Sequence, residues 1–325
     1  MFSDFHPTAS WKVLRLRSDL LHRTRDFFRT RGFLEIETPL LSHDVVVDRH
    51  LDPLRVTLPD DPRHPEVGRT MWLQTSPEFA MKRLMAAGGE AIFQITRAFR
   101  AAEQGRLHNP EFTIVEWYRQ SDSYADGMTL LSDLAESLLG LPRARRVTYK
   151  EAFQTHAGID PHRGTVAEVL AALESLQVEV PAGLADDRDG ILDLLLSQIV
   201  GPRLGVDQPT ILCEYPPTQA ALSQVRASEP PVAERFELYV RGIELANGYH
   251  ELLDPQVLRA RNRANNQLRA ADGKPTLPDE SRLLAAMEHG LPPCTGCALG
   301  FDRVVMLAAG VSTIAEAMAF PIDRA

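Results

Sequence analysis

Residues 91–119 read AIFQITRAFRAAEQGRLHNPEFTIVEWYR, and this stretch decides which fold the chain can adopt. Two runs of strand-forming residues, 91–99 and 112–119, flank a polar stretch that contains glycine and proline. Strands of this length, joined by an extended loop, suit an antiparallel pair. The stretch therefore predicts two neighbouring antiparallel strands in a sheet.

Helical patterns lie before and after this strand pair. In residues 11–31 apolar side chains recur at helical spacing, with polar residues between them. Ser76 followed by Pro77 is typical of an N-cap with proline at the first helical position, so we expect a helix there that runs to about Met85. Residues 121–202 also show a mostly helical pattern.

Further segments have the character of strands. Residues 33–37 alternate in hydrophobicity, and Gly32 and Pro39 bound the segment. A charged helix is expected after Asp254. The other strand candidates are residues 211–215, 234–240 and 298–304. Strands joined mainly by hairpins, with long helical excursions, indicate an α+β fold with an antiparallel sheet flanked by helices.

The organisation of the chain is expected to be simple. No internal repeat, low-complexity tract or linker is visible in the sequence. We therefore expect residues 1–325 to form a single domain, with a helical insertion at about residues 121–202.

The composition excludes several classes of protein. The 325 residues are 44% hydrophobic and 24% charged, which is typical of a globular protein and excludes wholesale disorder. No apolar run approaches the ~20 residues needed to cross a bilayer, and the N-terminal stretch lacks the features of a signal peptide. We therefore expect a cytoplasmic protein without a membrane partner. The formal net charge of −9 is weak evidence against a nucleic-acid substrate.

Cys294 and Cys297 form a lone CxxC motif near the end of the chain. Tetrahedral structural zinc needs four ligands, and no second ligand pair with suitable spacing accompanies this motif. We therefore expect two thiols in a glycine-rich turn rather than a zinc or redox site.

Three segments, in this order, resemble the three signatures of the class II aminoacyl-tRNA synthetases. The first is Gly32-Phe-Leu-Glu-Ile-Glu-Thr-Pro39, which in that family lies at the dimer interface. The second is Phe99-Arg100 followed by His108-Asn-Pro-Glu-Phe112, and the third is Gly300-Phe-Asp-Arg303 followed by an apolar helix. Each segment is weak alone, but three in the right order make a strong signal.

This resemblance implies an enzyme that uses ATP and Mg²⁺ to activate a carboxylate as its adenylate. Catalysis of such a transfer is mostly positioning and charge stabilisation, which arginines and a divalent cation supply. The resemblance places Arg100 at the α-phosphate and the attacking carboxylate, Arg303 at the γ-phosphate, and Phe112 against the adenine. The other expected nucleotide-binding residues are Ala102, Glu103, His108, Asn109, Glu244, Leu245 and Gly300.

Residues 236–252, FELYVRGIELANGYHEL, resemble the lysyl-tRNA synthetase branch in particular. By this resemblance Glu237 and Glu244 hold Mg²⁺, a hard cation that prefers oxygen ligands. Glu251 receives the side-chain ammonium of the substrate, supported by Tyr118, and Glu78 meets the other amine. The remaining substrate-binding residues are Ser76, Asn247 and Ala298.

The chain also resembles one group related to that branch, the elongation factor P–(R)-β-lysine ligases. The first signature begins with the helix near Trp11, so we expect a catalytic core without an anticodon-binding barrel. Ala298 stands where lysyl-tRNA synthetases have glycine and this ligase family has alanine. The resemblance implies (R)-β-lysine, with α-lysine less favoured, as the amino acid and a lysine side chain of elongation factor P as the acceptor. It also implies a homodimer, with the helix from Trp11 and the strand around Glu35 at the interface.

Two alternatives stay open from the sequence alone. One is a truncated lysyl-tRNA synthetase that charges tRNA, although the negative net charge of the chain makes tRNA an unfavoured partner. The other is a non-catalytic amino-acid sensor on the same core.

The family usually reads Arg-Asn-Glu where this chain has Arg100-Ala101-Ala102, so we expect ATP to bind more weakly here than in relatives with that glutamate.

Overall fold

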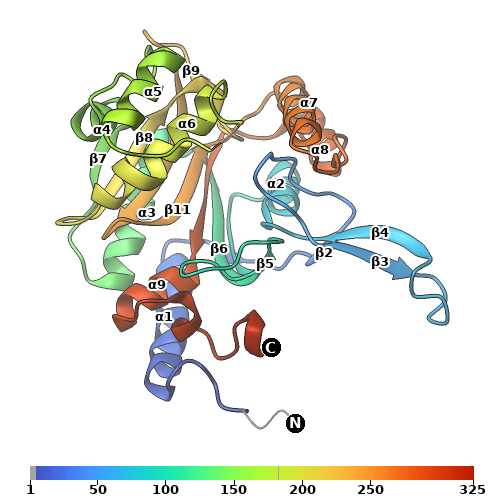
Figure 1. The fold of residues 1–325 in the computed structure, drawn as a ribbon. Coiled ribbons are helices and arrows are strands. Elements are labelled where there is room, and N and C mark those ends of the chain that lie inside the picture. The colour runs from blue at the N-terminus through green and yellow to red at the C-terminus, as the bar shows by residue number, and fades with distance from the viewer. Residues whose placement is uncertain (1–4, 182) are drawn as a thin grey trace. The chain divides into compact units, whose positions relative to one another are not determined.

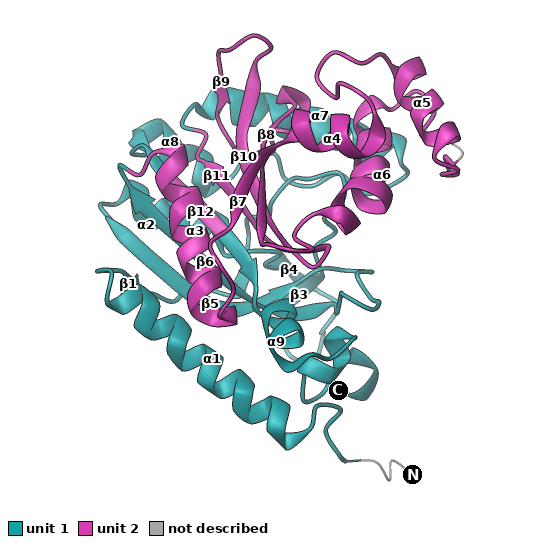
Figure 2. Ribbon diagram, turned by 90° about the vertical axis from the view of Figure 1, so that its left-hand side faces the viewer, with its two compact units in different colours: residues 1–121, 253–294, 298–325 teal, residues 122–252, 295–297 magenta. Residues whose placement is uncertain are grey.

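The chain folds into two compact units, which are described separately. A computed structural model describes residues 5–181 and 183–325 (Figure 1). The N-terminal stretch in which we looked for a signal peptide begins with four residues that lie outside the described ranges. Unit 1 contains residues 1–121, 253–294 and 298–325, and unit 2 contains residues 122–252 and 295–297 (Figure 2). The single-domain organisation stays a prediction, because compact units alone do not establish domains that fold independently.

The predicted strand pair is the main sheet element of unit 1. Strand β5 (Ala91–Phe99) pairs antiparallel with β6 (Glu111–Gln120), in a register that runs from Ala91 opposite Arg119 to Phe99 opposite Glu111. The short strand β1 (Leu34–Glu35) adds to β5 in parallel. The hairpin prediction is confirmed, whereas the strand predicted at 33–37 is shorter than expected.

Unit 1 also contains a small three-stranded sheet that the sequence analysis missed. Its strands are β2 (Leu41–Ser42), β3 (Arg55–Pro59) and β4 (Gly68–Leu73), in the order β2-β4-β3. Most residues of β3 and β4 are exposed or half-buried, so these strands lack the clear apolar alternation by which strands are recognised.

Helix α1 (Trp11–Arg29) opens unit 1, and Ser10 caps it by accepting a hydrogen bond from the Val13 N–H. Helix α2 (Glu78–Ala86) begins one residue later than predicted. Pro77 rather than Ser76 is its N-cap residue, because Pro77 already has non-helical backbone angles of φ −73° and ψ 0°. The Ser76 hydroxyl still accepts from the Glu78 N–H at 3.1 Å, so it satisfies one donor of the first turn.

The last part of unit 1 carries the remaining helices. Helix α7 (Pro255–Ala271) follows Asp254, where a charged helix was predicted, and packs against α8 (Arg282–Gly290), which in turn packs against α2. Helix α9 (Phe301–Ala309) packs against α1 and β6, and Figure 1 shows α1 and α9 side by side. Short 3₁₀ turns follow at Ile314–Ala317 and Ile322–Arg324.

Strand β12 (Cys294–Gly300) corrects two predictions. The strand expected at 298–304 ends at Gly300, because Phe301 begins α9. Cys294 and Cys297 lie buried on this strand instead of in a turn.

Unit 2 contains a sheet with strands in the order β11-β10-β8-β7. Strand β10 (Val232–Val240) pairs antiparallel with β11 (Ile243–His250), β8 (Thr210–Tyr215) and β9 (Val225–Arg226), and β7 (Arg145–Thr148) pairs parallel with β8. The predicted strands at 211–215 and 234–240 are therefore confirmed. Strand β7 interrupts the segment that we predicted to be helical.

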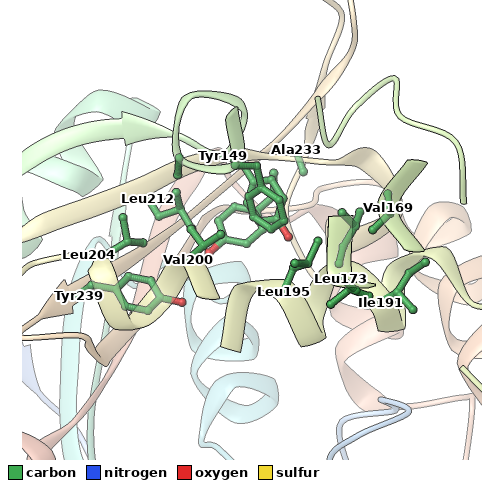
Figure 3. Packing of buried hydrophobic residues seen from close by; sticks show 14 of the residues in the cluster. Tyr149, Val169, Leu173, Ile191, Leu195, Val200, Leu204, Leu212, Ala233 and Tyr239 are labelled. Carbon is green, nitrogen blue, oxygen red and sulfur yellow. The ribbon is translucent and has the colours of Figure 1, made fainter. Parts of the chain in front are cut away.

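Helices flank this sheet. Helix α3 (Tyr124–Leu139) packs against β10 and β11, and α4 (Tyr149–Ala157) packs against β7 and β8. The other helices are α5 (Val166–Ser175), α6 (Arg188–Leu195), a π-helical turn at Leu196–Val200 and 3₁₀ turns at Gly201–Arg203 and Pro217–Gln219. Buried side chains from these helices and from β8 and β10 form the core shown in Figure 3.

The α+β class is confirmed, with sheets flanked by helices and two parallel pairs, β1 with β5 and β7 with β8, among the antiparallel strands. None of the helices in the described ranges is both long enough and apolar enough to span a membrane.

Candidate functional site

The expected amine-binding residues of unit 1 form one buried hydrogen-bonded cluster with a residue that the sequence analysis did not single out. The Ser76 hydroxyl donates to Glu116 Oε2 at 2.7 Å, and the Tyr118 hydroxyl donates to Glu116 Oε1 at 2.6 Å. The Lys82 ammonium lies 2.5 Å from Glu78 Oε1, one helical turn along α2. Strand β6 supplies two members of the cluster, the first two turns of α2 supply Glu78 and Lys82, and the loop before α2 supplies Ser76.

Glu116 is a group of this cluster whose acidity is strongly perturbed. Its side chain is 1% exposed, and burial together with the Glu78 carboxylate raises its pKa from 4.5 to about 7. The hydrogen bonds from Tyr118 and Ser76 and the charge of Lys82 oppose this rise. The cluster can therefore exchange a proton near neutral pH, and an additional cation would favour the ionised carboxylate.

Arg100 lies at the end of β5, where the expected nucleotide-binding loop begins. Its guanidinium carbon is 4.9 Å from the centre of the Phe112 ring, and its Nε–H donates to the Thr75 carbonyl at 3.4 Å. Glu103 Oε2 is 3.7 Å from Arg100 Nη1. The structure thus brings together the arginine, the aromatic ring and the carboxylate that we expected on the nucleotide side.

Arg303, in the first turn of α9, contacts the same loop. Its Nε–H donates to the Leu107 carbonyl at 3.2 Å, and its Nη2 is 2.7 Å from His108 Nε2. Burial and the charge of Arg303 lower the pKa of His108. A neutral imidazole can accept a hydrogen bond from the guanidinium, so His108 is suited to orient Arg303.

The loop of residues 100–110 is internally ordered. The Arg100 N–H donates to the Pro110 carbonyl at 2.9 Å, which closes the loop at its base. Ala102 has a left-handed backbone with φ 62°, an uncommon conformation for a residue with a side chain. The Asn109 amide group is 5% exposed, and it donates to the Glu111 carbonyl at 2.6 Å.

Ala298 and Gly300 are the two residues of β12 that we expected at the site. Both lie in the last part of this strand, which belongs to unit 1. Gly300 is the N-cap residue of α9, directly before the helix that carries Arg303. Ala298 is half-buried.

In unit 2, Glu237 belongs to a polar network on β10. Its Oε1 accepts from Arg235 Nη2 at 2.5 Å, and its Oε2 accepts from the Tyr239 hydroxyl at 2.7 Å. Arg235 also donates to the Gln219 carbonyl at 3.0 Å and lies 4.5 Å from the Tyr215 ring centre. Arg235, Glu237 and Tyr239 point to one face of the sheet, because they are spaced two residues apart along β10.

Four further expected residues lie on or next to β11. Glu244 pairs with Tyr239, and Asn247 pairs with Glu237, so both lie on the face of Glu237. Leu245 is buried at the point where the register of β10 and β11 shifts. Glu251 is fully buried just after the strand, and its carbonyl accepts from Gln224 Nε2 at 2.9 Å.

The residues of unit 2 fit a bound Mg²⁺ in part. Each oxygen of Glu237 accepts a hydrogen bond, yet a carboxylate oxygen has a second lone pair that can contact a metal ion. The Oδ1 atom of Asn247 is buried, and no described residue donates a hydrogen bond to it. No cluster of three or more His, Cys, Asp or Glu side chains suited to a metal ion occurs in the ranges that the structure describes. Substrate phosphates would therefore have to complete the coordination of Mg²⁺.

The sequence analysis missed Glu116, Lys82 and Arg235. Lys82 is 2% exposed and Arg235 is half-buried in its network, although charged residues are rarely buried unless paired. One signal was available: Lys82 follows Glu78 by four residues, the spacing of an ion pair on a helix. For Glu116 and Arg235 we see no comparable signal in the sequence.

Comparisons with known proteins found a family and relatives that match nearly the whole chain. The family described as tRNA synthetases class II (D, K and N) matches residues 2–324. A protein of Klebsiella pneumoniae subsp. pneumoniae named elongation factor P–(R)-beta-lysine ligase is 44% identical over 321 residues, which cover 99% of this chain and 98% of that protein. Proteins of the same name from Salmonella gallinarum and Salmonella arizonae are 43% and 42% identical, with the same coverage of both chains.

Proposed function

Because the chain belongs to the class II tRNA synthetases of the D, K and N type, and within them to the elongation factor P–(R)-β-lysine ligases, we propose that it activates (R)-β-lysine with ATP and joins it to a lysine of elongation factor P. The chain is an ATP-dependent amino acid ligase. The observation that carries the proposal is the 44% identity to a ligase of that name over nearly the whole length of both chains.

The first step forms the adenylate. A carboxylate oxygen of the amino acid attacks the α-phosphorus of ATP, and pyrophosphate leaves with the electron pair of the broken P–O bond. Arg100 is suited to hold the attacking carboxylate and the α-phosphate together, because its planar guanidinium can donate two parallel hydrogen bonds. Phe112 and Arg100 lie in contact, so they define one wall for the adenine and the phosphate.

Arg303 is proposed to neutralise the terminal phosphate. Its contacts with Leu107 and His108 fix the guanidinium to the loop that begins at Arg100. A preorganised donor stabilises developing charge without reorganisation during the reaction.

Mg²⁺ would neutralise phosphate charge while pyrophosphate leaves, with Glu237 and Glu244 as its protein ligands. Arg235 and Tyr239 hold the carboxylate of Glu237 in one orientation. Asn247, whose buried Oδ1 accepts no hydrogen bond from a described residue, supplies a further oxygen on the same face.

Recognition of the amino acid is proposed to depend on buried carboxylates. Glu78 and Glu116 share one cluster in unit 1, where Lys82 balances one of their charges. An ammonium group of the substrate would supply the second positive charge. Glu251, fully buried in unit 2, is proposed to receive the side-chain ammonium.

In the second step the nitrogen of the acceptor lysine attacks the carbonyl carbon of the adenylate. An amide bond forms, the bond between that carbon and the phosphate oxygen breaks, and AMP leaves with its electron pair. The amine must be neutral to attack, so it loses one proton before the step and another afterwards.

Transfer to the acceptor is tested by incubating elongation factor P with the enzyme, ATP, Mg²⁺ and (R)-β-lysine, and by measuring the mass of the acceptor. We expect one lysine of elongation factor P to gain one β-lysyl group. Arg100→Ala should abolish the gain, whereas Arg97→Ala, which removes an exposed arginine three residues earlier on β5, should preserve it. If the enzyme forms the adenylate but the mass of elongation factor P does not change, elongation factor P is refuted as the acceptor.

A further inference from the structure

The segment of residues 312–325 is hydrogen-bonded to the loop of residues 100–110 at three loop positions, although some two hundred residues separate them in the sequence. Both segments belong to unit 1. The loop carries the residues expected to bind the nucleotide, whereas nothing in the sequence analysis gave the 312–325 segment a role.

The first pair of contacts involves Arg106 at the tip of the loop. The Arg106 carbonyl accepts from the Ile314 N–H at 2.9 Å, and Arg106 Nη1 donates to the Ser312 carbonyl at 3.4 Å. The turn that presents these groups is itself fixed, because Glu316 closes a capping box with Thr313.

The second pair involves Asn109, next to the base of the loop, and Gln104, near its middle. The Ile322 N–H donates to Asn109 Oδ1 at 3.0 Å, and Gln104 Nε2 donates to both carboxylate oxygens of Asp323 at 2.8 Å. Asn109 is 5% exposed, and both of its amide atoms are used within the protein, one by Ile322 and one by Glu111. The orientation of the Asn109 side chain therefore depends on a backbone group of the 312–325 segment.

The segment is anchored on its other side. The N–H groups of Thr8 and Ala9 donate to the carbonyls of Ala319 and Met318 at 2.8 and 3.0 Å, and Figure 1 shows this part of the chain beside the residues that precede α1. Arg324 Nη2 donates to the His6 carbonyl at 2.9 Å.

A cavity adjoins part of the segment. This cavity of about 200 Å³ is lined by Ile322 and Met318 of the segment, by Asn109 and by residues of α1, β5 and β6. The hydrogen bonds described above therefore connect the segment to the loop beside a space that side chains do not fill.

We propose that residues 312–325 are a positioning element for the nucleotide loop, and that the Ile322 N–H, through Asn109, fixes the loop in the conformation that binds ATP. The inference rests on the proposed function of this loop. Its consequence is specific: loss of the Ile322 N–H weakens the binding of ATP and leaves the binding of the amino acid unchanged.

A matched pair of variants isolates the N–H group. Ile322→Pro and Ile322→Ala both remove the isoleucine side chain, but only proline removes the donor. Proline fits the backbone here, because Ile322 is the first residue of a 3₁₀ turn and Pro321 before it has φ −69° and ψ 168°, an extended conformation that proline tolerates in its neighbour.

The first readout is steady-state kinetics of ATP–pyrophosphate exchange. One hydrogen bond is worth ~1 kcal/mol, so we expect the KM for ATP to be about fivefold higher in Ile322→Pro than in Ile322→Ala, with the same KM for the amino acid. Equal KM values for ATP in the two variants, or an equal rise in both KM values, would overturn the inference.

The second readout does not require activity, so it separates this inference from the proposed function. Amide hydrogen exchange of residues 101–110, measured without ATP, should be faster in Ile322→Pro than in Ile322→Ala. If the wild-type protein shows no pyrophosphate exchange, the proposed function fails while the amide exchange still decides the inference: a faster rate supports it, and equal rates overturn it.

Discussion

At the scale of single residues, the buried acid Glu116 links the chemistry of the site to the stability of the protein. It is enclosed by Ser76, Tyr118, Glu78 and Lys82, and its pKa of about 7 lies above the ordinary 4.5. Between these two pH values the native protein binds a proton that the unfolded chain has lost. The contribution of Glu116 to stability therefore falls as the pH rises through this range.

Glu116→Gln is expected to remove this dependence on pH. The melting temperature of the wild-type protein should fall relative to that of the variant as the pH is raised from 4.5 to about 7, because only the wild type must ionise a buried group. Thermal unfolding in a series of buffers measures the difference. Glu66→Gln, which removes an exposed carboxylate, serves as the control, and parallel curves for wild type and Glu116→Gln would contradict the assignment.

Ala102 gives a second prediction at this scale. Replacing it with glutamate, the residue usual in the family, should lower the KM for ATP. The left-handed backbone at φ 62° adds little penalty to the change, because alanine already carries a Cβ atom there. Ala102→Gln has the same size without the charge and is the matched control. A KM for ATP that did not fall in Ala102→Glu would count against the prediction of weak nucleotide binding.

Residue roles were only partly predictable. Arg100, Arg303 and Phe112 could be found because they stand within signature segments, and the structure places them around one loop. Glu116 was missed because β6 is buried on both faces along most of its length, so alternation no longer separates core residues from surface residues. The placement of a carboxylate among Ser76, Tyr118 and Glu78 depends on tertiary contacts that no local pattern encodes.

At the scale of elements, the turn between β10 and β11 sets the positions of Glu237 and Glu244. Gly205 supports this turn, because its carbonyl accepts from the Arg241 N–H at 2.6 Å. A Cβ atom on Gly205 would lie 2.2 Å from the Tyr239 carbonyl oxygen, and its φ of +68° disfavours other residues. Close backbone approach therefore requires glycine here.

Gly205→Ala and Gly140→Ala form a matched pair. Both glycines have a left-handed backbone, φ +68° and +66°, but a Cβ atom on Gly140 would meet nothing within 4 Å. We expect Gly140→Ala to cost ~1 kcal/mol of unfolding free energy and Gly205→Ala about 1–3 kcal/mol more, because overpacking adds to backbone strain. Urea unfolding measures both values, and similar losses would show that the β10–β11 turn can move aside.

Elements with strong apolar patterns could be predicted from the sequence, and others could not. The β5–β6 hairpin and helix α1 have clear periodicity and were predicted nearly at their observed bounds. The exposed strands β3 and β4 lack that signal, and β7 has only four residues and pairs with β8 more than sixty residues later. The end of β12 was misplaced because apolar residues stand on both sides of the boundary between the strand and α9.

At the scale of the whole molecule, exposed apolar residues on α1 and β1 suggest self-association. Trp11 is 70% exposed and Leu34 is 64% exposed, in the two elements that the family resemblance places at a dimer interface. A homodimer thus remains a prediction, as does a location in the cytoplasm.

Leu34→Glu is expected to weaken the dimer, because it places a charge in an apolar interface. Val67→Glu is the matched control, since Val67 is also 64% exposed but lies between β3 and β4. Analytical ultracentrifugation should show a dimeric wild type and Val67→Glu variant and a more dissociated Leu34→Glu variant. The same mass for both variants would place the contact elsewhere.

The measurement that tests the central claim most directly is ATP–pyrophosphate exchange with Mg²⁺ and (R)-β-lysine, α-lysine or no amino acid. The proposed function predicts exchange that depends on the amino acid and is fastest with (R)-β-lysine. Exchange with α-lysine alone would contradict the proposed substrate and favour a lysyl-tRNA synthetase-like enzyme. Absence of exchange with every amino acid would contradict adenylate formation itself and favour a sensor built on the same core.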